Sequence, residues 1–452
     1  MLWNYIKSNM LKHPNKKIGI GNINLSYEEM CVFAEYFGAK LTDDYYGIVC
    51  TTELASAMAI LSCIAAGKTA IPIPTKYGVE TYRKILNQAD PPSIISDVDG
   101  ELKVLPFSNI LNSHDNDYKK SAVILFTSGS TGTPKGVMLS AENLISNIKS
   151  ISSYFPICEN DTILISRQLC HAAVLTGEFL LALTKGANIT FYSESFSPLK
   201  IIKIMQEQGV SVYCNTPTLM ASLARFAKRK DGLKIRLISI SGECIAEGNA
   251  QIIREAFPNA SIYTGYGLSE ASPRVAYLPC EMFDDMPSVA GIPLPNIKVK
   301  VVDTKGLEMK RGCVGELIVR GKNVMVGYFR DPGKTAEVIR KGWLYTGDYA
   351  YIDKAGYIHI KGRKDDMIIR AGMNIYPKEI ENVLSLDSRV EDVKVYGYFD
   401  GETQQLGVKI QGQFATTEEV ISLCRSTLPS YQIPTRVEIL EEIKRTSSGK
   451  KA

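Results

Sequence analysis

The sequence predicts an α/β protein with a large N-terminal domain of packed mixed sheets and helices, a following β-segment, and a small α+β domain at the C-terminus. Three observations predict this. Short apolar runs alternate with helical spacing up to Gly291, where the pattern changes to β-segments punctuated by glycine. A charged break, GRKDD at 362–366, precedes the last part of the chain. Because 452 residues with 45% hydrophobic content exceed one ordinary domain, we place the domains at 1–362 and 363–452.

The N-terminal part contains short apolar runs of the length and composition that strands have. They lie at 48–50, 70–72, 94–96, 122–126, 163–166, 189–192, 212–214 and 237–240. Many are followed by helical spacing, as at Leu199, Ile202, Ile204 and Met205. A helix is also expected after Ser140, a good N-cap, with its apolar face within 144–151. Strands joined by helices are typical of sheets with largely parallel strands.

Beyond Gly291 the sequence predicts strands at 299–303 and 315–320, and a hairpin that pairs 349–352 with 357–360. After the charged break, Pro377 suits the first turn of a helix that continues through 379–384. Apolar runs at 393–396 and 408–410 predict further strands. This separate set of helix and strand signals favours a second, smaller domain.

Charge and composition favour small-molecule chemistry. The 52 Lys and Arg residues against 48 Asp and Glu give a net charge of +4, too slight a bias to predict binding to nucleic acid or a membrane surface. The N-terminus lacks the apolar core of a signal peptide, and no stretch approaches the ~18 apolar residues of a membrane span, so we expect a cytoplasmic location. Ten scattered cysteines and four histidines predict neither a disulfide framework nor structural zinc.

The segment LFTSGSTGTPKGVMLS at 125–140 is the strongest functional signal. It directly follows an apolar run, and its hydroxyl side chains and glycines let donors and backbone N–H groups converge on an anion. A flexible linker is disfavoured because such linkers are seldom joined to a core strand. A P-loop is disfavoured because Lys135 stands between Pro134 and Gly136, not in Gly-Lys-Ser/Thr. We predict a loop that binds polyphosphate.

Four further motif-like segments follow along the chain. They are YTGYGLSEAS at 263–272, GWLYTGDYAYID at 342–353, IKGRKDDMIIRAGMNIYPKEIE at 360–381 and RTSSGKKA at 445–452. With 125–140, they resemble, in the same order, the motifs of the acyl-adenylate-forming superfamily: acyl-CoA synthetases, aryl-acid ligases and peptide-synthetase adenylation domains. The resemblance spans almost the whole chain. It implies an ATP-dependent carboxylic acid ligase that forms an acyl-adenylate, releases pyrophosphate and then makes a thioester, with a mobile small domain.

The resemblance also implies which residues bind ATP and Mg²⁺. The loop residues Thr127, Ser128, Gly129, Ser130, Thr131, Gly132 and Lys135 are expected at the β- and γ-phosphates. In the second segment, the residues expected at the nucleotide are Tyr266 as the platform for adenine, Gly267, Ser269 as a donor to the α-phosphate, and Glu270 as the catalytic Mg²⁺ ligand. Asp348 is expected to accept both ribose hydroxyls, and Arg363 to contact ribose or phosphate.

Three more residues are assigned, by the same resemblance, to the small domain and its movement. Asp365 matches the hinge position. Lys450 matches the catalytic lysine that bridges the acyl carboxylate and the α-phosphate, a role that suits a compact charge on a long stem. Gly372 resembles the glycine over which the pantetheine arm passes in the second step. The thiol acceptor is expected to be CoA or the phosphopantetheine of an acyl carrier protein acting in trans, and the sequence leaves that choice open.

Alignment with the family places the acyl pocket at His171, Leu175, Cys214, Ser239, Ser241, Gly265 and Arg274. His171, which we also count as catalytic, matches a gate histidine of acyl- and aryl-CoA ligases, whereas members that activate amino acids have an aspartate there. An acyl or aryl acid is therefore expected, and a core histidine is the alternative. Gly265 leaves space for a bulky acyl group. Arg274 pointing inward would pair a second carboxylate or ring hydroxyl, but we expect it to point outward into solvent.

Two other functions stay open at this stage. A non-catalytic nucleotide-binding regulator of the same fold is disfavoured because a pure binder has no need for Lys450 on a mobile domain beside Lys135, Glu270, Asp348 and Arg363. A luciferase-like oxygenase relative shares every motif through its own adenylation step. An ordinary ligase is the more economical interpretation.

Overall fold

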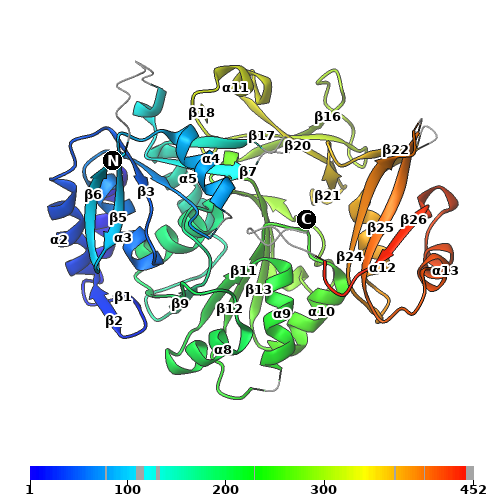
Figure 1. The fold of residues 1–452 in the computed structure, drawn as a ribbon, viewed down its shortest axis with the longest axis horizontal. Helices are drawn as coiled ribbons and strands as arrows, with labels where there is room; N and C mark the ends of the chain where they lie inside the picture. Colours follow the sequence, from blue (N-terminus) through cyan, green and yellow to red (C-terminus); the bar gives the residue numbers. More distant parts are fainter. Residues whose placement is uncertain are drawn as a thin grey trace.

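The computed structural model describes residues 1–76, 79–107, 117–128, 133–228, 230–370, 373–401 and 403–443. Two large mixed sheets with their helices form most of the N-terminal part, and an antiparallel sheet follows them in the chain. A three-stranded sheet with two helices forms a separate C-terminal part, at the right of Figure 1. The predicted α/β class, with a large N-terminal and a small C-terminal unit, is confirmed.

A nine-stranded sheet is the largest in the described chain. Its order is β15 (Ile292–Pro293), β14 (Arg274–Leu278), β13 (Ser261–Gly267), β12 (Leu237–Ser241), β11 (Val212–Asn215), β9 (Thr162–Ile165), β10 (Asn188–Phe191), β1 (Lys17–Ile20) and β2 (Ile23–Ser26). The strands from β13 to β1 are parallel, while β14, β15 and β2 run antiparallel to their neighbours. Helices α8 (Pro198–Glu207), α9 (Pro217–Ala227) and α10 (Glu247–Ala256) connect successive parallel strands, as the alternating pattern predicts.

The second sheet has seven strands. Its order is β18 (Gly327–Tyr328), β8 (Pro134–Leu139), β7 (Val123–Ser128), β4 (Thr69–Pro72), β3 (Tyr45–Ile48), β5 (Ser93–Val98) and β6 (Glu101–Pro106). Strands β7 and β8 are antiparallel and pair from Val123–Leu139 to Ser128–Pro134. The predicted phosphate-binding segment is therefore a hairpin whose two arms belong to the sheet.

The remaining strands lie in antiparallel sheets and in the C-terminal domain. The five-stranded sheet contains β16 (Lys298–Val302), β17 (Gly315–Arg320), β20 (Trp343–Ile352), β19 (Ile339–Arg340) and β21 (Ile358–Arg363). In the C-terminal domain, β22 (Ile368–Arg370) pairs with β23 (Met373–Ile375), and β24 (Val390–Phe399), β25 (Gln404–Gly412) and β26 (Arg436–Ile439) form a sheet. Helices α12 (Pro377–Leu384) and α13 (Thr417–Thr427) complete this domain.

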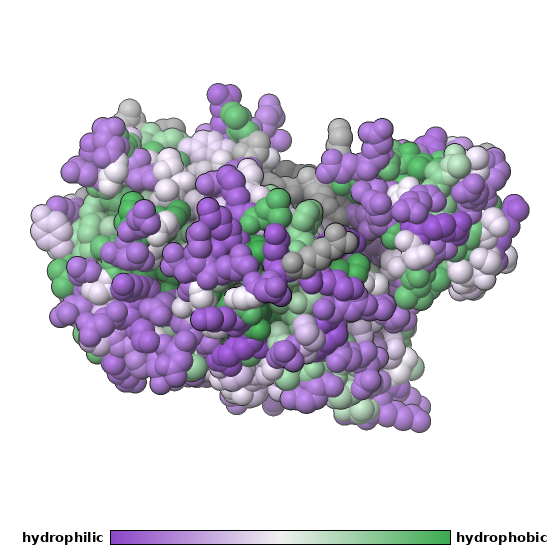
Figure 2. All heavy atoms as spheres, turned by 90° about the horizontal axis from the view of Figure 1, so that it is seen from below, coloured by the Kyte–Doolittle hydropathy of each residue, from purple (hydrophilic) through white to green (hydrophobic). Residues whose placement is uncertain are grey.

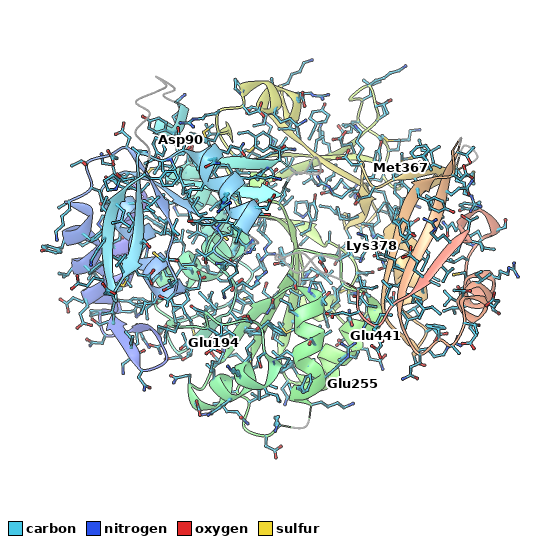
Figure 3. The ribbon with its side chains drawn as sticks, viewed as in Figure 1. Asp90, Glu194, Glu255, Met367, Lys378 and Glu441 are labelled. Atoms are coloured by element: carbon cyan, nitrogen blue, oxygen red, sulfur yellow. The ribbon has the colours of Figure 1, made fainter. Side chains whose placement is uncertain are left out.

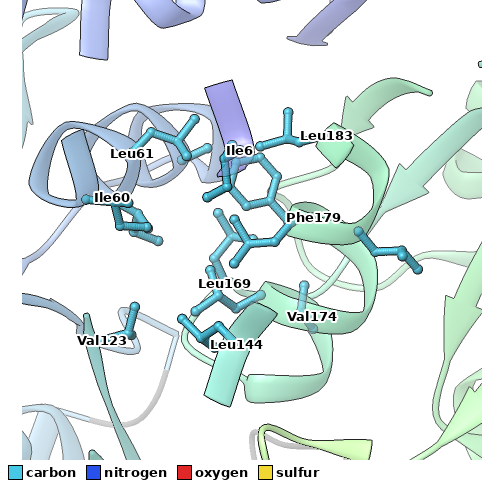
Figure 4. Close-up of a cluster of buried hydrophobic side chains, with 14 of the residues drawn as sticks. Ile6, Ile60, Leu61, Val123, Leu144, Leu169, Val174, Phe179 and Leu183 are labelled. Atoms are coloured by element: carbon cyan, nitrogen blue, oxygen red, sulfur yellow. The ribbon is translucent and has the colours of Figure 1, made fainter. Parts of the chain in front are cut away.

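Helices from the first half of the chain fill the space between the two large sheets. They are α1 (Leu2–Met10), α2 (Tyr27–Gly38), α3 (Glu53–Ala65), α5 (Ala141–Ser152), α6 (Ala172–Val174), the π-helix η2 (Leu175–Leu180) and α7 (Leu181–Lys185). Ile6, Ile60, Leu144 and Phe179 from four of these helices are fully buried together with Val123 of β7 (Figure 4). Helices α4 (Val79–Ala89) and α11 (Pro332–Val338) complete the N-terminal part.

Two local predictions are wrong. The strand expected at 48–50 runs instead from Tyr45 to Ile48, because its ladder with β4 begins at Tyr45 and the fully buried Tyr46 contributes to the sheet. Leu199, expected on the buried face of its helix, is 57% exposed, since α8 buries Ile201, Ile202 and Met205 instead. The other predicted strands and the helix capped by Ser140 lie within a few residues of their expected positions.

The face seen in Figure 2 is predominantly hydrophilic, with hydrophobic residues scattered between charged and polar ones. Within the described ranges, none of the helices combines the length and the apolar character needed to cross a membrane.

Candidate active site

The β7–β8 hairpin positions Lys135 near Tyr328, which in turn contacts the carboxylate of Glu270. Lys135 lies opposite Thr127 in the ladder, and its Nζ is 5.7 Å from the ring centroid of Tyr328. The Tyr328 hydroxyl donates to Oε1 of Glu270 at 2.8 Å. One tyrosine thus contacts both the predicted phosphate-binding lysine and the predicted Mg²⁺ ligand. Gly129, Ser130, Thr131 and Gly132 lie outside the described residues, as does the side chain of Ser128.

Tyr328 was not among the residues predicted from the sequence. It lies in the two-residue strand β18, where it pairs with Val137 of β8, so a residue distant in the sequence lies beside the hairpin. Burial raises the pKa of its hydroxyl, and the Glu270 carboxylate raises it further, so Tyr328 stays a neutral hydrogen-bond donor. A tyrosine outside any recognised motif carries no sequence signal for such a contact.

A second group surrounds Asp348, which β20 places opposite Arg363 of β21. The Tyr266 hydroxyl donates to Oδ2 of Asp348 at 2.5 Å, and Nη1 of Arg363 donates to Oδ1 at 3.1 Å. Nη1 of Arg363 also lies 3.1 Å from the carbonyl oxygen of Thr346. Both carboxylate oxygens of Asp348 are therefore engaged. Burial raises the pKa of Asp348, while the Arg363 charge and the Tyr266 hydrogen bond oppose that rise.

The turn after β13 carries the other predicted nucleotide contacts. Gly267 ends β13, and a Cβ added there would lie 2.0 Å from the carbonyl oxygen of Pro273, so only glycine fits. Ser269 and Glu270 occupy the short 3₁₀ helix η3 (Ser269–Ala271), and the Glu270 carbonyl accepts the Met325 N–H at 2.9 Å. This bond fixes the backbone that presents the Glu270 side chain.

The predicted walls of the acyl pocket share one face of the nine-stranded sheet. Cys214 lies directly beside Ser239, and Ser241 lies directly beside Gly265, on the neighbouring strands β11, β12 and β13. Residues that pair across strands, and residues two apart along a strand, point to the same face. The structure therefore brings these four positions together. Leu175, the first residue of the π-helix η2, is fully buried.

Arg274 is a correction to the sequence analysis, which expected it to point into solvent. The residue is only 4% exposed. A Cβ added to Gly265 would lie 2.1 Å from its Nη1, and one added to Gly177 would lie 3.7 Å from its Nη2. The guanidinium thus lies between β13 and the π-helix, in space that two glycines leave open. On β14, Arg274 pairs with Gly267 at an irregularity of the ladder, and this directs its side chain inward.

Two charged residues next to Arg274 were missed by the sequence analysis. Glu178 of the π-helix is 2% exposed and pairs with Nη2 of Arg167 at 2.5 Å. Burial raises the pKa of Glu178, whereas the charges of Arg167 and Arg274 oppose that rise. The π-helix is the relevant local signal, because such turns concentrate at functional sites, but helical periodicity in a sequence does not reveal them.

His171, the predicted gate residue, is half-buried and directly precedes α6. Its carbonyl oxygen accepts the N–H groups of Val174 and Leu175 at 3.0 and 2.9 Å, and its own N–H donates to the Gln168 carbonyl at 3.2 Å. The backbone at His171 is therefore fixed on both sides.

The predicted hinge residue, Asp365, and the junction with the C-terminal domain follow Arg363 in the chain. Asp365 follows β21 within a turn. Across the junction, Lys361 of β21 pairs with Glu379 of α12. Lys378, which Figure 3 labels between α10 and the C-terminal sheet, pairs with Glu381 at 3.2 Å. Gly372 and Lys450 lie outside the described residues.

Comparison with known proteins gives the chain a family. The model of the AMP-binding enzymes matches residues 7–329, and that of the AMP-binding enzyme C-terminal domain matches residues 379–450. A feruloyl-CoA synthase of Amycolatopsis sp is 32% identical over 334 residues, which are 73% of this chain and 67% of that protein.

A long-chain-fatty-acid–CoA ligase of Bacillus subtilis is 32% identical over 337 residues, 73% of this chain and 60% of that protein. Among solved structures, the o-succinylbenzoate CoA synthetase of Bacillus subtilis in complex with its acyl-adenylate has a TM-score of 0.85, with 22% identity over 99% of this chain and 96% of that one. That likeness confirms the fold. The two family models that match it, together with its 32% identity to the feruloyl-CoA synthase, show that this chain belongs to the AMP-binding enzymes, the acyl-adenylate-forming superfamily that its sequence resembles.

Proposed function

We propose that this protein is an ATP-dependent acid–thiol ligase. It joins a carboxylic acid to ATP to form an acyl-adenylate with release of pyrophosphate, and then transfers the acyl group to a thiol. The acid is an acyl or aryl acid and not an α-amino acid. Membership of the AMP-binding enzymes and the relatives named as CoA synthetases and ligases support the reaction class. Because the chain matches 67% and 60% of those two relatives, the complete reaction is a proposal for this chain.

The observation that carries the proposal is the meeting of four charged residues from four separate motifs. Lys135 contacts Tyr328, which donates to Glu270, and the Glu270 charge acts on Arg363 and Asp348. The cations Lys135 and Arg363 and the carboxylates Glu270 and Asp348 therefore lie in one part of the molecule. A binding site for a nucleoside triphosphate needs donors and positive charge at the phosphates and an acceptor at the ribose.

The chemistry places specific demands on these residues. In the first step, a carboxylate oxygen of the acid bonds to the α-phosphorus, and the bond from that phosphorus to the bridging oxygen of pyrophosphate breaks. Lys135 would offset the charge that grows on the leaving pyrophosphate. Glu270 offers a carboxylate oxygen of the kind that Mg²⁺ prefers, and the ion would neutralise phosphate charge when bound. Asp348 would accept the ribose hydroxyls on its remaining lone pairs, while Tyr266 and Arg363 keep its carboxylate oriented.

The second step adds a thiol. Its sulfur bonds to the acyl carbon, and the bond from that carbon to the oxygen of AMP breaks. We propose CoA as the acceptor, because the named relatives are CoA synthetases and ligases, with an acyl carrier protein in trans as the alternative. Lys450 is proposed to act in the first step and Gly372 in the second. A cytoplasmic location, where ATP and CoA are supplied together, fits this reaction.

The proposal is tested by pyrophosphate release from Mg-ATP with a panel of aryl, medium-chain and long-chain acids and amino acids, with and without CoA. We expect release that depends on one class of acid and a thioester product when CoA is added. Asp348→Asn should abolish release, and Asp353→Asn is the matched control, because Asp353 lies in the turn of the same β20–β21 hairpin and pairs with His359 instead. ATP binding without release for any acid would instead favour a regulator that only binds nucleotide.

Lys450 gives a second test that separates the two steps. Lys450→Ala should lower adenylate formation by orders of magnitude and leave thioester formation from preformed acyl-AMP unchanged, because the lysine would bridge the acid and the α-phosphate only in the first step. Equal losses in both steps would contradict this role.

A further inference from the structure

A buried group of three charged side chains lies beside the predicted acyl pocket. Arg274 is 4% exposed and Glu178 is 2% exposed, and the side chain of Arg167 is 14% exposed. Glu178 pairs with Arg167 at 2.5 Å, and its charge also acts on Arg274. Both guanidinium charges therefore act on one carboxylate, but only Arg167 forms an ion pair with it. The group carries one positive charge in excess.

The excess charge is directed toward the positions expected to line the pocket. Nη1 of Arg274 lies where a side chain of Gly265 would be. Burial is the main cause of the raised pKa of the Cys214 thiol, and the charges of Glu178, Arg167 and Arg274 also act on it. The hydroxyl of Tyr154 also interacts with Arg274. Tyr154 stacks on Tyr277 with ring centroids 3.9 Å apart, which holds that hydroxyl in place. The charged group thus borders the face shared by Cys214 and Gly265.

Hydrogen bonds within the protein do not satisfy this group. Nε of Arg274 and Oε2 of Glu178 are both buried and have no hydrogen-bond partner among the described residues. A buried charge without full pairing costs several kcal/mol, so it is usually matched by a counter-ion or by a ligand. Glu178 pairs with Arg167 through Oε1, so the buried Nε of Arg274 is a donor for which an anion would supply the acceptor.

The reacting carboxylate is not that anion. Gly265 and Tyr266 are successive residues of β13, so their side chains point to opposite faces of the strand. Tyr266 contacts Asp348 of the nucleotide group, whereas the guanidinium of Arg274 lies against Gly265. The anion that fits Arg274 therefore sits away from the nucleotide.

We propose that Arg274 binds a second carboxylate of the acid substrate, so that the preferred substrate is a dicarboxylic acid activated at one end. The inference rests on the proposed ligase function and names the substrate class of the same site. The second carboxylate accepts hydrogen bonds from the guanidinium and neutralises the excess charge. Glu178, held by Arg167, keeps Arg274 oriented without neutralising it, and so acts as a positioning residue.

The test compares matched acids on the unmodified protein. Each set contains a monocarboxylic acid, the acid of the same chain length with a carboxylate in place of the terminal methyl, and the monomethyl ester of that diacid, from short to long chains and with aryl spacers. We expect kcat/KM for pyrophosphate release to be about tenfold or more higher for a diacid than for its ester, because the ester leaves the buried guanidinium without its anion. A preference for the monoacid or the ester in every set would overturn the proposal.

Substitution of Arg274 gives a second readout. Arg274→Gln should lower the ratio of kcat/KM for the diacid to that for the monoacid about tenfold or more, mainly through the KM of the diacid, while Arg274→Lys should keep part of the preference. Arg236→Gln is the matched control, since Arg236 also pairs with a buried acid, Asp161, on the same sheet. It should not change the diacid-to-monoacid ratio.

The outcomes separate the two proposals. If monoacids are adenylated and Arg274→Gln leaves the ratio unchanged, the second-carboxylate assignment is wrong and the ligase function stands. If ATP binds and no acid of any class releases pyrophosphate, the ligase function fails and the assignment fails with it. If Arg274→Gln does not fold, the matched acids on the unmodified protein still decide.

Discussion

Replacing Tyr266 with phenylalanine tests whether this residue acts on the nucleotide through Asp348 as well as through its ring. The variant keeps an aromatic face for adenine and removes one hydroxyl. That hydroxyl donates to Oδ2 of Asp348 at 2.5 Å, and Asp348 is 6% exposed. A hydrogen bond to a charged group contributes about 1.5–3 kcal/mol, so the variant should be destabilised by that amount. We expect urea unfolding to show the loss.

ATP binding should weaken as well, because an Asp348 carboxylate held only by Arg363 is less well oriented for the ribose. If about half of the lost energy appears in binding, the Kd for ATP rises about tenfold, since 1.4 kcal/mol corresponds to a factor of ten. Isothermal titration measures this directly. Tyr263→Phe is the matched control, because Tyr263 is buried on the same strand and faces Tyr154 rather than Asp348.

A Tyr266→Phe variant with unchanged stability and unchanged ATP affinity would refute this reasoning. It would mean that the hydroxyl contact is incidental and that the ring alone supports the nucleotide. A tenfold loss in both Tyr266→Phe and Tyr263→Phe would also refute it, since the effect would then be a general consequence of losing a buried hydroxyl from β13.

Three further predictions follow from the same geometry. Gly267→Ala should lower stability by about 1–3 kcal/mol in thermal unfolding, because its Cβ would meet the Pro273 carbonyl oxygen at 2.0 Å and backbone must move. Arg167→Met should lower the free energy of unfolding in urea by about 3–5 kcal/mol, because it leaves Glu178 buried and poorly paired. A loss no larger than that of a substitution in a solvent-exposed ion pair would contradict this. The raised pKa of Asp348 means that the folded state binds its proton more tightly than the unfolded state. The contribution of Asp348 to the free energy of unfolding should therefore be largest below about pH 3.8 and decline as pH rises through the raised pKa. ATP affinity should fall as pH drops through the same pKa. Asp348→Asn should remove both pH dependences.

The sequence predicts the strands of the large sheet closely because their environment is simple. Strands β9, β11 and β12 are buried on both faces, so runs rich in apolar residues identify them, whereas β10 buries only alternate residues. The same rule misplaced β3, because Gly47 interrupts its short apolar run. It could not anticipate that the phosphate-binding segment is a hairpin, since pairing between β7 and β8 depends on the register across the turn.

Motifs located the candidate site, and tertiary contacts supply what the motifs lack. Each motif residue could be named from its own segment, but Tyr328, Glu178 and Arg167 lie outside every motif and gain their meaning only from neighbours distant in the chain. Arg274 illustrates the limit most directly. A lone arginine on a strand is usually exposed, and the two glycines that make room for its guanidinium are 88 positions apart in the chain (265 − 177).

The pairing of β20 with β21 restricts where the small domain can pivot. Asp348 faces Arg363 in the ladder, and the next residue, Lys364, still bonds to the large domain through its N–H to Gly347 at 2.8 Å and its Nζ to Glu316 at 3.1 Å. A pivot before these contacts would pull Arg363 away from Asp348 and disrupt the nucleotide group at every movement. We therefore infer that the pivot lies at Asp365, just beyond them, so that Arg363 stays with the nucleotide while the domain turns.

Contacts across the junction include the packed rings of Tyr349 and Tyr376 and an ion pair that is weak enough for such a turn to break. Across the junction, Lys361 pairs with Glu379, and both side chains are partly exposed, at 26% and 36%. Ion pairs of this kind contribute about 0–1 kcal/mol. A ligand that favours one arrangement by a few kcal/mol would then be sufficient to shift the population of domain positions. With the pivot proposed at Asp365, the nucleotide group would stay in place while the domain turns, an arrangement that suits two successive reactions at one site.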